Sequence, residues 1–154
     1  MTAFVNSNLS DLTLISKGKV RDIYSTSSPD HLLFVASDRI SAYDVILKNV
    51  GIIILSVQAN KRRRAFFLFF QGIPEKGKCL TEISLFWFNK LQHIIPNHFV
   101  TANIDDMPEE IWKYKDQLDG RAMLVRRAEV VPLEAIVRGY LVGALSFFLC
   151  MNVI

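Results

Sequence analysis

Cysteine is scarce in this chain of 154 residues, which contains Cys79 and Cys150 and no others. Two cysteines are too few for a disulfide framework, and their spacing matches no metal site. The chain also lacks the run of roughly 20 apolar residues that a transmembrane helix needs. Its first residues, MTAFVNSNLSD, contain no basic segment followed by an apolar core, so they do not resemble a signal peptide. Together these absences favour a cytoplasmic protein that makes no use of a membrane.

Excess charge of one sign is small as well. Eighteen lysines and arginines against fifteen acidic residues give a formal net charge of +3. This balance permits phosphate-bearing ligands but does not argue for nucleic acid as a partner. Hydrophobic residues make up 51% of the chain, which excludes general disorder. A chain of this length suits one domain and can bury a real core.

Alternating and β-branched residues indicate a set of short strands. We expect the first two over Leu12–Ser16 and Val20–Ser25, joined by a turn at Gly18 and Lys19. Further strands are expected over His31–Ala36, His98–Ile104, Arg121–Ala128 and Val130–Tyr140. The polar residues ahead of them, Met1–Asp11, are expected to be mobile.

Two helices are expected later in the chain. The first covers Leu80–Ile95 with Thr81 as its N-cap, and the second covers Pro108–Leu118. The first helix repeats apolar side chains at helical spacing: Ile83, Phe86, Trp87, Leu91 and Ile94. No basic residues interleave these side chains, so we expect them to face the core rather than to stack on nucleic-acid bases.

Three polar clusters are candidate sites. Lys17, Lys19 and Arg21 alternate around Gly18, which lets the backbone approach a ligand closely. Backbone N–H groups with flanking cations suit a phosphate, although an ordinary solvated basic hairpin has the same composition.

The second cluster is the segment SDRISAYD, Ser37 to Asp44, at the end of an expected strand. It suits either a self-satisfied turn with an Asp38–Arg39 pair or part of a binding site. The third is Glu134 and Arg138, which share one face of an apolar strand. They form either a structural salt bridge or an arginine that holds an anion beside a carboxylate.

Three stretches carry a resemblance to a known family. They are SKGKVRDIYS (Ser16 to Ser25), LLFVASDRISAYDVILKN (Leu32 to Asn49) and VVPLEAIVRGY (Val130 to Tyr140). In this order they resemble SAICAR synthetases, the phosphoribosylaminoimidazole-succinocarboxamide synthases. The resemblance implies an α+β fold with a twisted antiparallel sheet, packed helices, and ATP held between two lobes, rather like an ATP-grasp enzyme or a kinase. This chain would carry the first lobe and the start of the second.

The resemblance also implies a reaction. The family uses ATP and Mg²⁺ to join L-aspartate to carboxyaminoimidazole ribonucleotide, giving SAICAR, ADP and phosphate in purine biosynthesis. The substrate carboxylate attacks the γ-phosphate, and the aspartate amine then captures the acyl phosphate. We find no Asp-x-Lys-x-Glu-Phe-Gly motif, which supplies magnesium-binding and catalytic groups in the family. No catalytic or metal residue is therefore assigned, and we expect this chain alone to be inactive.

Candidate site residues are those that stand at the positions of the family's binding residues. The resemblance implies ATP binding by Gly18, Lys19 and Arg21, and by a hinge at Val125, Arg126, Arg127 and Ala128. The residues alone would equally suit a plain hairpin with solvated arginines at that hinge. The resemblance implies substrate binding by Asp38, Arg39, Ser41, Asp44, Glu134 and Arg138. Among these, Arg138 would bind the ribonucleotide phosphate, and Glu134 would orient the substrate or Arg138.

The chain departs from the family pattern at two places. Residues 50–71, VGIIILSVQANKRRRAFFLFFQ, form an insert that begins with a GU-type codon and could end with CAG, as a translated intron would. From Val142 an apolar tail replaces the family sequence, with Ala144 where the family has serine. We therefore divide the chain into a family portion, 1–141, and a tail, 142–154. Two alternatives to an active ligase remain. One is a non-catalytic fragment that binds nucleotide weakly or not at all, and the other is a basic interaction module that binds nucleic acid through Lys61–Arg64 of the insert.

Overall fold

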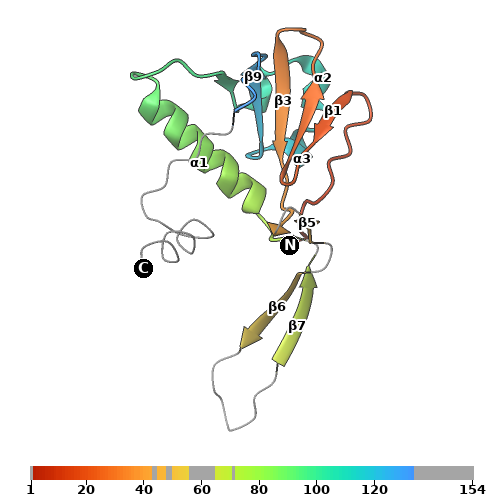
Figure 1. Ribbon diagram of the computed structural model, residues 1–154. Helices are drawn as coiled ribbons and strands as arrows, with labels where there is room; N and C mark the ends of the chain where they lie inside the picture. Colours follow the sequence, from red (N-terminus) through yellow and green to blue (C-terminus); the bar gives the residue numbers. More distant parts are fainter. Residues whose placement is uncertain (1, 43–44, 48–49, 56–64, 71, 134–154) are drawn as a thin grey trace, which may run out of the picture.

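The computed structural model describes residues 2–42, 45–47, 50–55, 65–70 and 72–133. A five-stranded sheet forms the centre of the described chain, in the order β1-β2-β3-β9-β8 (Figure 1). Its strands are β1 (Leu14–Lys17), β2 (Arg21–Ser25), β3 (His31–Ala36), β8 (Phe99–Thr101) and β9 (Ala122–Arg126). Every neighbouring pair is antiparallel, which confirms the α+β architecture expected from the sequence.

The main hydrophobic core lies on one face of this sheet. Alternate residues of β3, Leu33 and Val35, point into it, as the two-residue period of a strand requires. Three short helices cover that face: η1 (Ile104–Asp106), α2 (Glu109–Trp112) and α3 (Lys115–Leu118). Each contributes a fully buried side chain, namely Ile104, Ile111 and Leu118. The single helix expected over Pro108–Leu118 is therefore two short helices, and Pro108 is the N-cap of α2.

The N-terminal segment also belongs to the core, so the expectation of a mobile Met1–Asp11 is wrong for its described part. Leu9 and Leu12 are buried in the main cluster, and Phe4 packs against it. The Phe4 N–H also donates to the Asp38 carboxylate at 2.7 Å. A few apolar residues within a polar segment are enough to anchor it to the core once a sheet face is available.

Helix α1 (Lys76–Leu91) lies across the opposite face of the sheet (Figure 1). It begins four residues earlier than expected, and Thr81 is not its cap, because the Thr81 hydroxyl donates to the Gly77 carbonyl inside the helix at 3.1 Å. The small residues Gly77 and Thr81 face the sheet. A Cβ atom at Gly77 would lie 2.5 Å from the Ala36 carbonyl oxygen, so β3 approaches the helix too closely for any larger residue.

The orientation expected for this helix is consequently wrong. Its apolar series points away from the sheet, and the side chains are 40% to 70% exposed: Ile83, Phe86, Trp87, Leu91 and Ile94. Phe88 is the aromatic side chain that turns inward, where its ring contacts those of His98 and Phe99. Close packing against small residues therefore decided which face was buried, rather than the number of apolar side chains.

Two separate hairpins follow β3. The first pairs β4 (Ser41–Ala42) with β5 (Val45–Ile46), and the second pairs β6 (Val50–Leu55) with β7 (Ala65–Phe70). The β6–β7 hairpin forms its own two-stranded sheet and extends away from the central sheet (Figure 1).

The chain leaves the body of the molecule and returns to it at one point. The Ile73 N–H donates to the Asp38 carbonyl at 3.0 Å. Lys76 Nζ donates to the Arg39 carbonyl at 3.0 Å. The segments on either side of the two hairpins are thus joined directly.

The described part of the expected strand Val130–Tyr140 is irregular, with Val130, Val131 and Leu133 exposed. None of the helices in the described part of the chain has the length and apolar character needed to cross a bilayer.

Candidate functional site

The turn between β1 and β2 carries the basic residues expected to meet a phosphate. The Gly18 N–H donates to the Arg21 carbonyl at 2.7 Å, which closes the turn. A Cβ atom at Gly18 would lie 2.8 Å from that same carbonyl oxygen, so the turn requires glycine. Lys17 and Lys19 are exposed, and Lys17 Nζ donates to the Asn6 side chain at 3.0 Å.

Arg21 lies at the start of β2 and points toward α1. Its Nη2 donates to the Ser84 hydroxyl at 3.1 Å, while its Nε is buried and has no hydrogen-bond partner among the described residues. Burial, together with the charge of Arg21, lowers the pKa of His98 from its ordinary value. The His98 ring lies between those of Phe34 and Phe88, at centroid distances of 6.0 and 5.3 Å.

Arg39 and Asp22 form a buried ion pair beneath this turn. Arg39 Nη2 lies 2.6 Å from Asp22 Oδ1, and Nη1 lies 3.1 Å from Oδ2. The same guanidinium donates to two carbonyls of the turn, those of Gly18 at 2.9 Å and Lys19 at 3.2 Å. The turn is therefore attached to the interior by a charged side chain.

Asp38 forms a second buried ion pair, with Arg121 Nη1 at 3.1 Å. It also accepts the Gly77 N–H at 2.8 Å and the Phe4 N–H. Burial alone would raise the pKa of Asp38, but the two backbone donors and the Arg121 charge together hold it below the ordinary value. Asp38 and Arg39 therefore do not pair with each other, although the turn interpretation expected them to. Asp38 pairs with Arg121, and Arg39 pairs with Asp22.

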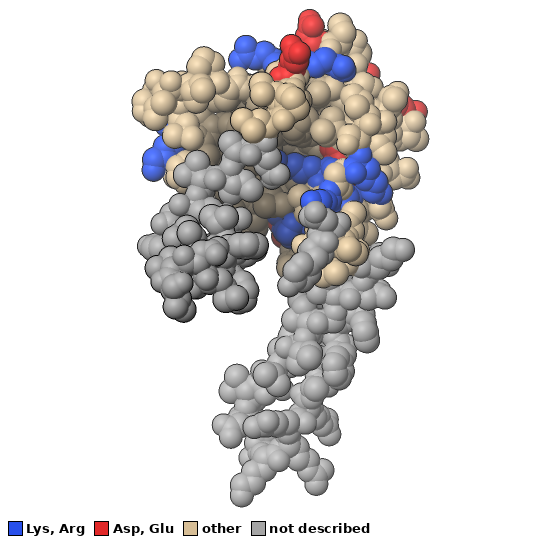
Figure 2. Space-filling view, viewed as in Figure 1, with Lys and Arg blue, Asp and Glu red and all other residues tan. Residues whose placement is uncertain are grey.

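Lys76 connects these groups at the first turn of α1. Burial lowers the pKa of its ammonium group; the Asp38 charge opposes this effect, and the charges of Arg21 and Arg39 add to it. Lys76 therefore contributes another cation to the region between the glycine turn and α1. Figure 2 shows several lysine and arginine side chains gathered at the lower right of the described surface in this view.

The expected hinge lies at the end of β9. Val125 is buried, whereas Arg126, Arg127 and Ala128 are exposed. The Arg126 N–H donates to the His98 carbonyl, and the Arg127 N–H donates to the Asp30 carbonyl, both at 2.7 Å. In this structure those two backbone donors bond to the protein itself.

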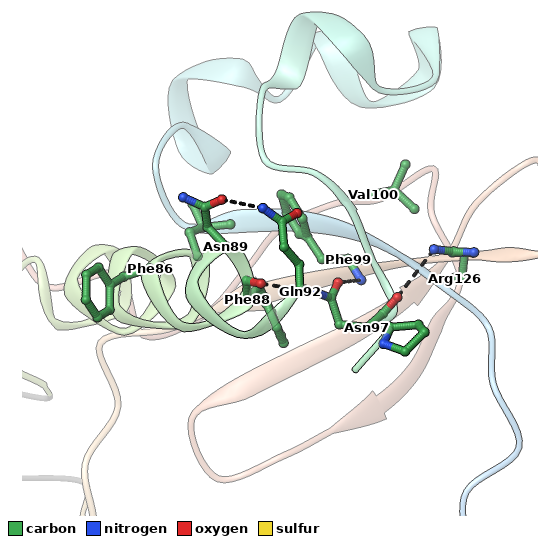
Figure 3. A pocket seen from close by; sticks show the side chains of 10 residues that line it. Phe86, Phe88, Asn89, Gln92, Asn97, Phe99, Val100 and Arg126 are labelled. Atoms are coloured by element: carbon green, nitrogen blue, oxygen red, sulfur yellow. Dashed lines mark hydrogen bonds between the residues drawn. The ribbon is translucent and has the colours of Figure 1, made fainter. Parts of the chain in front are cut away.

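A cavity of about 790 Å³ opens between the C-terminal half of α1 and β8 (Figure 3). Phe88, Phe99, Asn97 and Gln92 line it, and Arg126 closes one side by donating to the Asn97 carbonyl at 3.3 Å. Arg126 is the one predicted ATP-binding residue that contacts this cavity, so the cavity and the glycine turn are separate features.

The remaining candidate site residues are described only in part. Ser41 is half-buried in β4 and lies opposite Ile46. Asp44, Glu134 and Arg138 lie outside the described residues, as do Lys61–Arg64 and the tail 142–154. Within the described ranges no group of three or more His, Cys, Asp or Glu side chains could hold a metal ion.

Sequence reasoning missed Asp22, Lys76 and Arg121. Asp22 could have been found from the sequence, because it lies two residues before Tyr24 and so faces the same side of β2. An acidic residue on a buried face needs a buried partner. Nothing in the sequence indicated Arg121, because its partner Asp38 lies 83 positions away in the chain.

Comparison with known proteins identifies the family. The SAICAR synthetase family model matches residues 14–52 and 54–152. The chain is 46% identical over 140 residues to the phosphoribosylaminoimidazole-succinocarboxamide synthase of Thermodesulfovibrio yellowstonii, covering 91% of this chain and 40% of that protein. The Pichia angusta synthase is 47% identical over 139 residues, with 86% of this chain and 38% of that protein covered. This chain thus spans about 40% of the length of these relatives.

Solved structures agree with the sequence matches. A SAICAR synthase structure superposes with a TM-score of 0.73 at 37% identity, covering 97% of this chain and 45% of that one. The Saccharomyces cerevisiae SAICAR synthase complexed with SAICAR gives a TM-score of 0.74 at 38% identity, with the same coverage. Sequence, family model and fold therefore agree, and the chain belongs to the SAICAR synthetase family.

Proposed function

We propose that this chain contributes the ATP-binding turn to SAICAR synthesis in de novo purine biosynthesis. The reaction is the ATP-dependent ligation of L-aspartate to carboxyaminoimidazole ribonucleotide, with release of ADP and phosphate. The observation that carries the proposal is the glycine turn, in which Gly18 is sterically required and cations flank the backbone. Family membership and the SAICAR complex of the yeast relative support the choice of reaction.

Charge neutralisation is the chemical task of the turn. The triphosphate of ATP carries several negative charges, and its γ-phosphate gains more as the substrate carboxylate attacks it. Lys19 is exposed on the turn, and Arg21 has a buried Nε without a partner among the described residues. Both are suited to donate charged hydrogen bonds to phosphate oxygens. The hinge residues Val125, Arg126, Arg127 and Ala128 remain the proposed contacts of the adenine.

Most of the residues proposed to bind the ribonucleotide lie outside the described part of the chain. Asp44, Glu134 and Arg138 are proposed to bind the ribonucleotide with Ser41. The described residues offer no group suited to magnesium, so that ion would need ligands elsewhere in the enzyme. The cytosol is the compartment that the composition favours for this chemistry.

Binding of MgATP to this chain tests the proposal. We expect Lys19→Ala and Arg21→Ala each to raise the Kd for MgATP about tenfold or more, because a charge-assisted hydrogen bond contributes about 1.5–3 kcal/mol. Isothermal titration calorimetry would measure the change. Lys115→Gln is a matched control, because Lys115 pairs with Asp105 on the exposed surface of α3. Unchanged affinity in both variants, or no binding by the unaltered chain, would contradict the proposal.

A further inference from the structure

We infer that Arg39 is a positioning residue of the ATP-binding turn rather than a contact of the ribonucleotide. It holds two peptide groups of the turn from inside the protein, so that the turn is already in shape before a nucleotide arrives. The inference rests on the proposed function of the turn, and it reassigns a residue that the resemblance placed among the substrate contacts.

The hydrogen-bond capacity of Arg39 is fully used within the protein. A guanidinium group has five N–H donors. Nε donates to the Lys19 carbonyl, and Nη2 donates to the Gly18 carbonyl and to Asp22 Oδ1. Nη1 donates to the Val5 carbonyl at 2.9 Å and to Asp22 Oδ2. With five acceptors for five donors and 3% of its surface exposed, Arg39 has no donor left for a substrate.

The two bonds to the turn fix the direction of its peptide groups. Arg39 is buried, so the carbonyls of Gly18 and Lys19 that bond to it point into the protein. In a planar trans peptide the N–H group points opposite to the carbonyl. The N–H vectors of Lys19 and Val20 are therefore directed away from Arg39, and a pair of aligned peptide dipoles with N–H groups outward attracts an anion.

Asp22 in turn fixes the guanidinium. It is 1% exposed, it binds Arg39 through both oxygens, and its Oδ2 accepts the Ser7 hydroxyl at 2.8 Å. A two-pronged contact of this kind sets the plane of the guanidinium as well as its position. A lysine at position 39 would keep the charge but could not hold two carbonyls and a carboxylate in one plane.

The first test needs no substitution. In the unaltered chain, we expect the Arg39 Nε–H to be protected from hydrogen exchange and visible by NMR at pH 7. The Nε–H groups of the exposed Arg126 and Arg127 serve as the internal reference. Addition of carboxyaminoimidazole ribonucleotide should leave the Arg39 signal unchanged. Exchange as fast as in the two exposed arginines, or a shift caused by the ribonucleotide, overturns the inference.

The second test uses Arg39→Lys in the full chain. We expect exchange of the Gly18 amide, which donates to the Arg21 carbonyl across the turn, to rise at least tenfold while residues 31–36 of β3 stay protected, and we expect the Kd for MgATP to rise about tenfold or more. Lys115→Gln should change neither measurement. Unchanged exchange in the turn, or faster exchange with an unchanged Kd, overturns the positioning role.

The two proposals fail in different ways. If the unaltered chain binds no MgATP, the proposed function fails, while exchange at the turn still decides whether Arg39 holds it. If Arg39→Lys unfolds the whole chain, exchange in β3 rises together with that in the turn. The Nε–H measurement on the unaltered chain then decides the question.

Discussion

Asp38 joins three separate parts of the chain through one carboxylate. It accepts the Phe4 N–H of the N-terminal segment and the Gly77 N–H of α1, and it pairs with Arg121 just before β9. Both members of the ion pair are almost fully buried, so neither charge has water to replace a lost partner. Removing one partner of such a pair typically destabilises a protein by about 3–5 kcal/mol.

Asp38→Asn should therefore destabilise the fold by about 3 kcal/mol at pH 7. Because the pKa of Asp38 is lowered in the folded state, its stabilising contribution is present above the ordinary value of 3.8 and is lost as the pH falls below it. The difference in unfolding free energy between the two proteins should thus shrink with acid. Urea unfolding at pH 7 and pH 3 measures it.

Asp105→Asn is the control for this prediction, because Asp105 pairs with Lys115 in an exposed position. Its effect should be small at both pH values, since water screens an exposed ion pair. If the unfolding free energies of Asp38→Asn and the unaltered chain differ by the same amount at pH 7 and at pH 3, the charge of Asp38 is not the stabilising feature.

The sequence indicated some of the charged residues that are important, but it did not indicate the side chains with which they pair. The crowding of Asp38, Arg39 and Ser41 after a strand marked a charged part of the chain, and the structure places Asp38 and Arg39 in buried ion pairs, while their binding roles stay predictions. Adjacency in sequence suggested that Asp38 and Arg39 pair, whereas each side chain reaches a partner brought near by the sheet, 83 positions away for Asp38 and 17 for Arg39. Only the pairing of strands determines such contacts.

Among the secondary-structure elements, the strands of the central sheet were the easiest to predict. The His31–Ala36 strand has the expected bounds, and the turn at Gly18 has the expected glycine. Helix α1 was predicted to exist, but it starts four residues earlier than expected and buries a different face. The apolar spacing of Phe86 and Trp87 indicated a buried face, but the backbone of β3 lies too near α1 to accept it.

The β6–β7 hairpin supports the proposal that residues 50–71 are an addition to the family portion. It pairs within itself and belongs to no other sheet of the described chain. Deleting residues 50–71 should therefore leave the five-stranded sheet intact, raise the yield of folded protein and preserve or improve MgATP binding. Circular dichroism and calorimetry on both chains would measure this.

The rival interpretation gives the opposite outcome for the same deletion. If Lys61–Arg64 form a nucleic-acid-binding module, the unaltered chain binds an oligonucleotide with an affinity that falls steeply with salt, and the deletion abolishes that binding. A replacement of the four basic residues by glutamine, with the hairpin kept, separates loss of charge from loss of the hairpin.

At the scale of the whole molecule, apolar surface is the main feature. The outward side chains of α1 include Phe86 and Trp87, whose rings contact edge to face at 5.3 Å. Val130 and Val131 add exposed apolar surface near the end of the described chain. Monomeric proteins seldom expose large apolar patches, and such patches promote association.

We therefore expect this chain to self-associate at micromolar concentration, and we expect Phe86→Ser with Trp87→Ser to weaken that association at least tenfold. The melting temperature should change little, because both side chains are exposed. Sedimentation velocity over a concentration series measures the effect. Val45→Ser, at an exposed position of β5, is the apolar control. A chain that stays monomeric at all concentrations would contradict the prediction.

The bond between Ile73 and Asp38 has a consequence for protein engineering. This bond holds together the two ends of the segment between Asp38 and Ile73. The stability of the fold should therefore depend little on the length of that segment. Doubling or halving such a loop changes the closure free energy by only about 0.6 kcal/mol. This position should therefore accept a grafted fluorescent domain or an affinity tag without loss of the central sheet.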